Sequence, residues 1–114
     1  MPATKSSFTE IDNYRNTETF TEESGHEGGI TRTTRRAVRL YDTMIFDVSW
    51  NDGLMILNHG GHKTATTKRR MNEALDAADL PYKVRQISGE WFLMNEDGEK
   101  VQSFNGKKRL AFWL

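Results

Sequence analysis

The sequence lacks cysteine altogether, and it also lacks any long run of apolar residues. Without thiols, the chain has no disulfide bridge, no thiolate catalysis and no cysteine-based zinc site. A membrane-spanning helix needs roughly 18 consecutive apolar residues, and no such run exists. The opening residues MPATKSSFTEID contain neither the basic nor the apolar region of a signal peptide. We therefore expect an intracellular protein with no membrane partner.

The chain also lacks net charge, because its 16 basic residues balance its 16 acidic residues. The charges are unevenly placed: residues 1–28 hold six acids and two bases, which leaves ten acids and 14 bases for the rest. Apolar side chains are sparse over residues 1–29 and follow neither helical nor strand spacing. We therefore predict a flexible, disordered acidic arm over residues 1–29 and a single domain over residues 30–114. Such a domain either binds a polyanion, with the arm competing for the same surface, or carries a solvating tail.

The domain shows alternating strand patterns on both sides of one helical pattern. Apolar residues at Met71, Ala74, Leu75 and Ala78 follow helical spacing and predict a helix over 66–79, which Thr64 or Thr66 caps and which ends before Pro81. The predicted strands are 37–50, split at Asp42, and 54–57, 82–88, 91–94 and 100–104. The order β-β-α-β-β-β predicts an α+β fold, an antiparallel sheet of about five strands with one helix packed on a face.

The loop before the helix is the strongest candidate site, because it combines glycines, hydroxyl groups and cations at a helix start. Cations in the first helical turn oppose the helix dipole, and a bound phosphate would offset that cost. Arginines on the approach to the first strand, of which Arg35 and Arg39 share one face, can extend the same basic surface. The predicted anion-binding or nucleic-acid-binding residues are Gly60, Gly61, Lys63, Thr64, Thr66, Thr67, Lys68, Arg69, Arg70, Arg35 and Arg39.

A purely structural interpretation of the same loop is equally open. Arg69 can pair with Glu73 four residues later, and the two glycines can serve only a tight turn. The GxxxxGK[ST] spacing of a nucleotide-binding P-loop is absent, which disfavours a nucleoside triphosphatase. His59 and His62, with His26, can be imagined as metal ligands, but solvated loop histidines are the expected state. We predict no metal, no cofactor and no catalytic residue.

Several short motifs around the loop also resemble a family of small bacteriophage proteins. In that family a TGG...T.TTK.RMN motif precedes a W.V strand and a late F..G element. The resemblance spans roughly residues 41–106, leaves the acidic arm outside, and implies a phage origin, hence the host cytoplasm, together with a shared fold. His59 stands where the family pattern has Thr or Ser. The matching segments here are 57–61, 64–72, 82–84, 89–92 and 104–106.

Three functions fit these observations. The first is a non-enzymatic phage accessory protein that binds nucleic-acid phosphates through the Gly60–Arg70 loop. The second is an anti-defence inhibitor, similar in role to an anti-CRISPR, that binds a host protein or protein–nucleic acid complex. The third is a small phosphate-ester enzyme or nucleotide binder, which lacks a general base. The apolar end, residues 110–114, either covers the sheet or docks on a partner.

Overall fold

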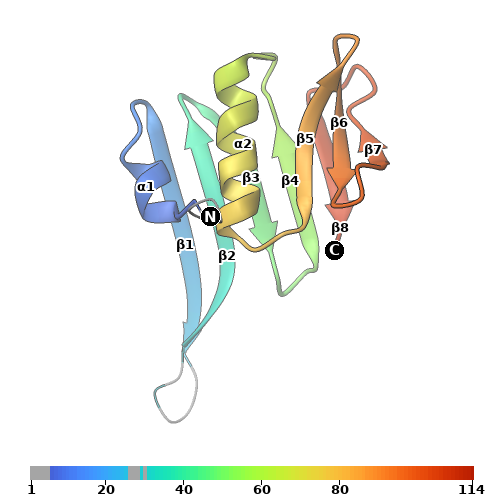
Figure 1. The fold of residues 1–114 in the computed structure, drawn as a ribbon. Coiled ribbons are helices and arrows are strands. Elements are labelled where there is room, and N and C mark those ends of the chain that lie inside the picture. Colours follow the sequence, from blue (N-terminus) through green and yellow to red (C-terminus); the bar gives the residue numbers. More distant parts are fainter. Residues whose placement is uncertain (1–5, 26–28, 30) are drawn as a thin grey trace, which may run out of the picture.

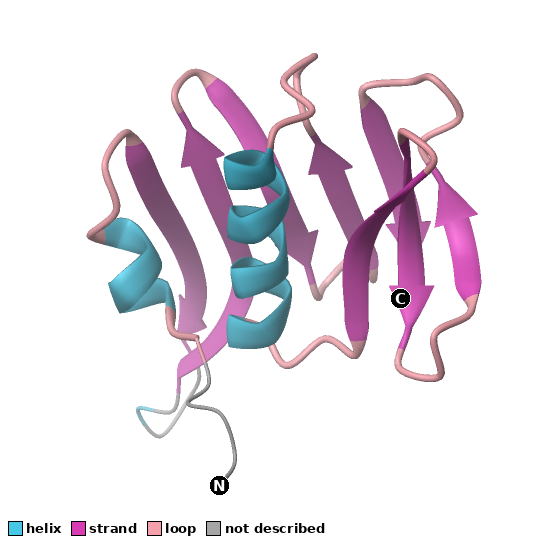
Figure 2. Cartoon of the chain, turned by 45° about the horizontal axis from the view of Figure 1, so that its top comes forward, coloured by secondary structure: helices cyan, strands magenta, loops and turns pink. Residues whose placement is uncertain are grey.

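The computed structural model describes residues 6–25, 29 and 31–114, which form two layers (Figure 1). The back layer is a five-stranded antiparallel sheet in the order β1-β2-β3-β4-β8. The front layer holds two helices and a three-stranded antiparallel sheet, β5-β6-β7 (Figure 2). The elements are α1 (Phe8–Asp12), β1 (Thr17–Gly25), β2 (Thr31–Leu40), β3 (Thr43–Ser49), β4 (Leu54–Asn58), α2 (Ala65–Ala77), β5 (Tyr82–Ile87), β6 (Glu90–Asn95), β7 (Lys100–Ser103) and β8 (Arg109–Trp113). Neither helix in this described part of the chain has the length and apolar character needed to cross a bilayer.

The α+β class is confirmed, but the strands form two sheets where we expected one. The reason lies in the C-terminal segment, which pairs with β4 as the edge strand β8. Its Leu110 and Phe112 lie opposite Leu57 and Met55 and turn toward the same core. Because β8 occupies that edge, the three strands after α2 have no place in the large sheet. They form a separate sheet, which lies beside α2 over the inner face of the large sheet.

The prediction of a flexible arm over residues 1–29 is wrong for residues 8–25, which form α1 and β1. Residues 1–5 and 26–28 lie outside the described residues. Phe8 and Ile11 of α1 are buried in the common core, where the Phe8 ring lies 6.3 Å from the ring of Phe46. Strand β1 pairs with β2 along its length, and Glu18 and Glu22 form ion pairs with arginines of β2. The acidic segment is therefore part of the same folded unit as residues 31–114.

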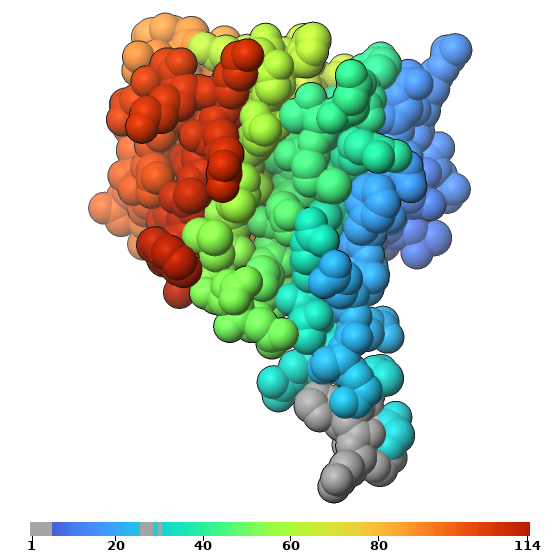
Figure 3. Space-filling model, turned by 180° about the vertical axis from the view of Figure 1, so that it is seen from behind, coloured from blue at the N-terminus to red at the C-terminus, as the bar shows by residue number. Residues whose placement is uncertain are grey.

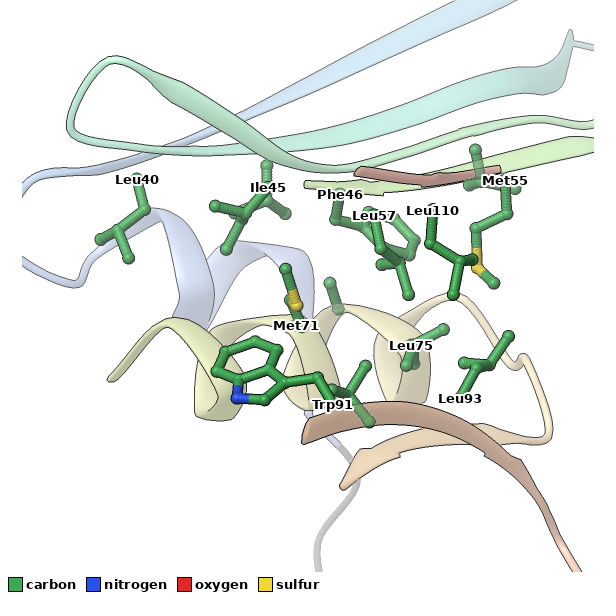
Figure 4. Close-up of a cluster of buried hydrophobic side chains, with 14 of the residues drawn as sticks. Leu40, Ile45, Phe46, Met55, Leu57, Met71, Leu75, Trp91, Leu93 and Leu110 are labelled. Carbon is green, nitrogen blue, oxygen red and sulfur yellow. The ribbon is translucent and has the colours of Figure 1, made fainter. Parts of the chain in front are cut away.

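The core lies between the two layers and contains side chains from both sheets and both helices (Figure 4). Phe46 and Leu57 point down from the large sheet, Met71 and Leu75 come from α2, and Trp91 comes from β6. Every one of these side chains is fully buried. A fully buried side chain of this size contributes about 1.5–3 kcal/mol of transfer free energy, so this shared core joins helix and both sheets into one unit.

One departure from the expected alternation occurs in β3, where Ile45 and Phe46 are consecutive and both buried. The pairing between β2 and β3 shifts between Val38 and Arg39, so that Phe46 lies opposite Val38 while Met44 lies opposite Arg39. Ile45 is therefore the extra residue of a β-bulge, which turns its side chain toward the core.

Candidate functional site

The loop between β4 and α2 is shaped by its two glycines. Gly60 and Gly61 have φ angles of +62° and +90°, which disfavour any residue with a Cβ atom. A Cβ atom on Gly60 would also lie only 2.5 Å from the Thr43 hydroxyl. Their backbone N–H groups donate to the Asn58 Oδ1 and the His59 Nδ1, at 2.9 and 3.0 Å. Both N–H groups thus donate to acceptors within the turn, so neither is a free donor for the predicted phosphate contact.

The three threonines at the start of α2 have different roles. Thr64 is the helix cap: its hydroxyl accepts a hydrogen bond from the Thr67 N–H at 3.2 Å. The Thr67 hydroxyl is buried against that of Thr64 at 3.0 Å. Thr66 is exposed. Of the predicted hydroxyl ligands, two therefore stabilise the helix start, and Thr66 faces solvent.

His59 is a buried structural residue, which corrects the expectation of a solvated loop histidine. Its side chain is 5% exposed and packs against the rings of Trp91 and Phe104, at centroid distances of 5.4 and 5.5 Å. Burial lowers its pKa, and the nearby Lys63 and Lys108 lower the pKa further, while a hydrogen bond with the Lys107 backbone partly offsets this. His59 is therefore neutral in the folded protein near neutral pH. His26 lies outside the described residues.

Acidification is expected to destabilise the protein through His59. The folded-state pKa lies below the ordinary value of about 6.5, so the unfolded chain binds more protons as pH falls through that value. The free energy of unfolding should therefore decrease below about pH 6.5, where the folded state must protonate a buried ring. Urea denaturation at a series of pH values should show this loss in the wild type. His59→Gln should flatten the profile, whereas His62→Gln, which changes an exposed ring, should not.

Of the two arginines predicted at the start of α2, Arg70 is neutralised by an acid of the same helix, whereas Arg69 is exposed. Arg70 is buried, 9% exposed, forms an ion pair with Glu73 and stacks on the ring of Tyr14 at 3.5 Å. The Glu73 Oε1 accepts from Arg70, and the Glu73 Oε2 accepts from the Tyr14 hydroxyl at 3.1 Å. Glu73 therefore pairs with Arg70, and the pairing predicted with Arg69 is wrong. Arg69 is exposed and lines a groove between α2 and β5 that also contains Asp76. Arg70 therefore does not belong to an anion site.

Arg35 and Arg39 lie on the outer face of the large sheet, which the helices do not cover, so the structure does not bring them to the loop. Arg35 donates two hydrogen bonds to Asp47, at 2.9 and 2.7 Å, and one to Glu22 at 3.0 Å. Its hydrogen bond to Asp47 raises the pKa of Arg35 above its already high value. Arg39 forms an ion pair with Glu18. The predicted basic surface thus loses these two arginines to β1 and β3.

The loop that carries Lys63 packs against two other loops, one of which carries Lys107 and Lys108. The Lys63 ammonium donates to the Gly89 carbonyl at 2.9 Å, and the backbone N–H of His59 donates to the Lys108 carbonyl at 2.9 Å. A Cβ atom on Gly61 would lie 3.7 Å from the Lys108 Nζ. Loops 59–64, 88–89 and 104–108 are therefore packed together at one end of the molecule. We call this the basic end; it also includes Arg15 and Asp42 in the neighbouring connections.

The opposite end of the molecule is acidic. The connections after β3, α2 and β6 all lie there (Figure 1), and in these described connections every charged residue is an acid. A net charge of zero thus conceals two oppositely charged ends, because antiparallel pairing sorts alternate loops to alternate ends. The acids of this end are Asp52, Asp79, Glu96, Asp97 and Glu99.

An open groove of about 990 Å³ runs along the basic end between β7 and β8. The two strands belong to different sheets, and the Gln102 side chain bridges them by donating to the Ala111 carbonyl at 3.0 Å. Lys107 and Lys108 line the groove together with the polar Ser103 and Asn105. Sequence reasoning missed these two lysines, although the consecutive cations after the Asn105-Gly106 turn were a usable signal.

A family model described as Kyanoviridae Gp96 protein matches residues 3–111. The match confirms the expected likeness to a phage protein family. It also covers α1 and β1, so the expectation that the acidic segment lies outside the resemblance is wrong. No curated protein and no solved structure matches the chain.

Proposed function

Because this chain belongs to the Kyanoviridae Gp96 family of phage proteins, we propose that it is a non-enzymatic accessory protein that binds nucleic-acid phosphates through its basic end. One observation carries the proposal: the loop that carries Lys63 packs against the loop that carries Lys107 and Lys108, and these last two lysines line an open groove. Lysines at the edge of a groove neutralise a phosphate backbone and release its counterions on binding. Contacts of this kind position a nucleic acid without reading its sequence.

The lack of acidic partners for these lysines among the described residues supports the proposal. Arg35, Arg39 and Arg70 are each held by a carboxylate. Among the described residues, Lys63, Lys107 and Lys108 take part in no ion pair, and the only hydrogen bond of the Lys63 ammonium goes to an uncharged carbonyl. Their charge is therefore available to a polyanion, and the acids at the far end of the molecule would orient its approach.

The buried histidine favours a binding role over a catalytic one. His59 lies between the loops that carry these lysines, but its Nδ1 accepts the Gly61 N–H at 3.0 Å and the ring also bonds to the Lys107 backbone. A general base needs a free nitrogen within reach of its substrate. In this fold His59 connects the two loops that carry the lysines, and so helps to build the basic end.

Replacing the three lysines together is expected to abolish most of the binding. We expect intact protein to raise the fluorescence anisotropy of short labelled DNA and RNA, and Lys63→Ala/Lys107→Ala/Lys108→Ala to bind far more weakly. Each lost phosphate contact should reduce the slope of log K against log salt by about 0.7–0.9. The triple variant should therefore have a slope smaller by about 2 to 3 when each lysine makes one contact.

A matched control separates location from total charge. Arg32→Ala/Lys83→Ala/Lys100→Ala removes the same charge from strand residues toward the acidic end and should leave binding nearly unchanged. Equal losses in both variants would contradict a localised site. Absence of binding by the intact protein at low salt would contradict the proposal itself and direct the search to a host protein partner. That rival can no longer use Glu18 and Glu22 as free acids, since both are paired within the sheet.

A further inference from the structure

The outer face of the large sheet is uncovered, and Trp113 protrudes from its border. Figure 3 shows this face, with β8 at one border and β1 at the other. Trp113 is 71% exposed, although its backbone is firmly held: it pairs with Leu54, and the next N–H, of Leu114, donates to the Gly53 carbonyl at 2.8 Å. A large apolar side chain that is exposed on an ordered strand is typical of a binding hot spot.

A hollow of about 410 Å³ lies on the same outer face, next to this tryptophan. Leu54, the cross-strand neighbour of Trp113, and Ile56 supply apolar wall, and the guanidinium of Arg35 offers a surface on which an indole can stack. Glu22, Asp47 and Asp52 also line this β3 hollow, so acids outnumber the one arginine. The hollow therefore suits an aromatic ring accompanied by a cation.

Strand β8 carries that combination. Residues of β8 alternate across the sheet, so Arg109, Ala111 and Trp113 share the outer face while Leu110 and Phe112 point to the core. Among the described residues, no ion pair involves Arg109. One chain thus presents both a projecting tryptophan, with a cation four residues away on the same face of β8, and an acid-lined hollow on one surface.

We propose that this outer face binds the same face of a second copy, with Trp113 of each copy in the β3 hollow of the other. A two-fold interface needs a surface that complements itself, and the knob and hollow on adjacent strands meet this condition. A two-fold axis along β4 would place β8 of one copy over β3 of the other. Trp113 would then lie near the level of the hollow at Leu54, and Arg109 one step from the level of Asp47. The two sheets would then pack face to face with nearly aligned strands, as in an aligned β-sandwich.

The inference goes beyond the proposed function and does not depend on it. An axis parallel to the strands leaves the basic ends of both copies on the same side of the dimer. A dimer could therefore present two basic ends to one polyanion, but it should form without nucleic acid. Measuring the oligomeric state of the protein alone keeps a failure of this inference separate from a failure of phosphate binding.

Sedimentation velocity of the full chain across a wide concentration range tests the dimer. The wild type should sediment as a dimer at high concentration and dissociate on dilution. Trp113→Asp should raise the dissociation constant by at least about 30-fold, as expected for loss of a hot spot. Arg109→Asp should weaken the dimer as well, by placing like charge against the hollow. Tyr41→Asp changes an aromatic that is 66% exposed at the basic end, and this control should remain dimeric.

Folding and fluorescence provide the checks. Thermal melts by circular dichroism, recorded at a dilution where the wild type is monomeric, should match for all three variants, because each changes a residue that is exposed in the single chain. The tryptophan emission of the wild type should shift to shorter wavelength as dimer forms, and Trp113→Phe should retain the dimer while losing most of that shift. A wild type that is monomeric at every concentration, or a dimer that is indifferent to both Trp113→Asp and Arg109→Asp, would overturn the inference.

Discussion

Replacing Asn72 by leucine is expected to lower the free energy of unfolding by about 2–4 kcal/mol, since two buried backbone groups lose their partners. Asn72 projects from α2 toward β5, where its Nδ2 donates to the Val84 carbonyl at 3.0 Å. Its Oδ1 accepts from the Val84 N–H at 2.7 Å. Val84 is only 1% exposed, so water cannot replace these hydrogen bonds. Urea denaturation at neutral pH measures the loss.

The Asn72 side chain stands in for a missing neighbouring strand. One edge of β5 pairs with β6, and the other faces α2, where no backbone ladder is possible. An amide offers one donor and one acceptor in the plane of the sheet, and so reproduces what a strand residue provides. The hydrogen bonds therefore fix the position of the small sheet against the helix, which the apolar contacts of the core alone would not specify.

Aspartate at the same position gives a more selective test. Asn72→Asp keeps an acceptor for the Val84 N–H but places a carboxylate beside the Val84 carbonyl, so it should destabilise the protein at neutral pH. Protonation would restore a donor, so the deficit should shrink as the solution is acidified. Asn51→Leu in the exposed β3–β4 turn is the control, with an expected change within about 0.5 kcal/mol. Equal losses for Asn72→Leu and Asn51→Leu would contradict the role assigned to Asn72.

Local patterns in the sequence predicted the local structure well. The helix over 66–79 is observed at Ala65–Ala77, with Thr64 as one of the two caps expected. The predicted strands from residue 37 to 104 are all present, although the first of them, β2, begins six residues before the predicted start, at Thr31. These elements are encoded by spacing and turn chemistry within a few residues of each other.

Contacts between distant segments were beyond the same reasoning. Strand β1 is mostly polar because it is an edge strand, and its acids are balanced by Arg35 and Arg39 only once β1 lies beside β2. The same pairings removed two arginines from the expected site. Conversely, Lys107 and Lys108 join the loop at Gly61 only because β8 pairs with β4. The sequence therefore predicted a basic surface at the loop, but three of the six cations assigned to it, Arg35, Arg39 and Arg70, form ion pairs with acids of the same chain.

Replacing Glu73 by leucine is expected to cost about 3–5 kcal/mol, because it leaves the cation of Arg70 buried without a counterion. The two side chains are 11% and 20% exposed, so solvent screens the pair weakly. The substitution also removes the acceptor of the Tyr14 hydroxyl, which ties the segment between α1 and β1 to α2. Urea denaturation should show the loss, and proteolysis should cleave the N-terminal segment of the variant faster than that of the wild type.

The double variant Arg70→Met/Glu73→Leu decides whether the cost comes from the unpaired charge. Methionine matches the length of the arginine stem and can pack on the Tyr14 ring, so the double variant should be more stable than Glu73→Leu alone. Such a coupling would show that the cost of Glu73→Leu comes from the unpaired charge. The ion pair would then serve mainly to position α1 against α2, with little net contribution to stability. If the two losses simply added, Arg70 and Glu73 would not act together. Phe8 and Ile11 would then hold the N-terminal segment by burial alone.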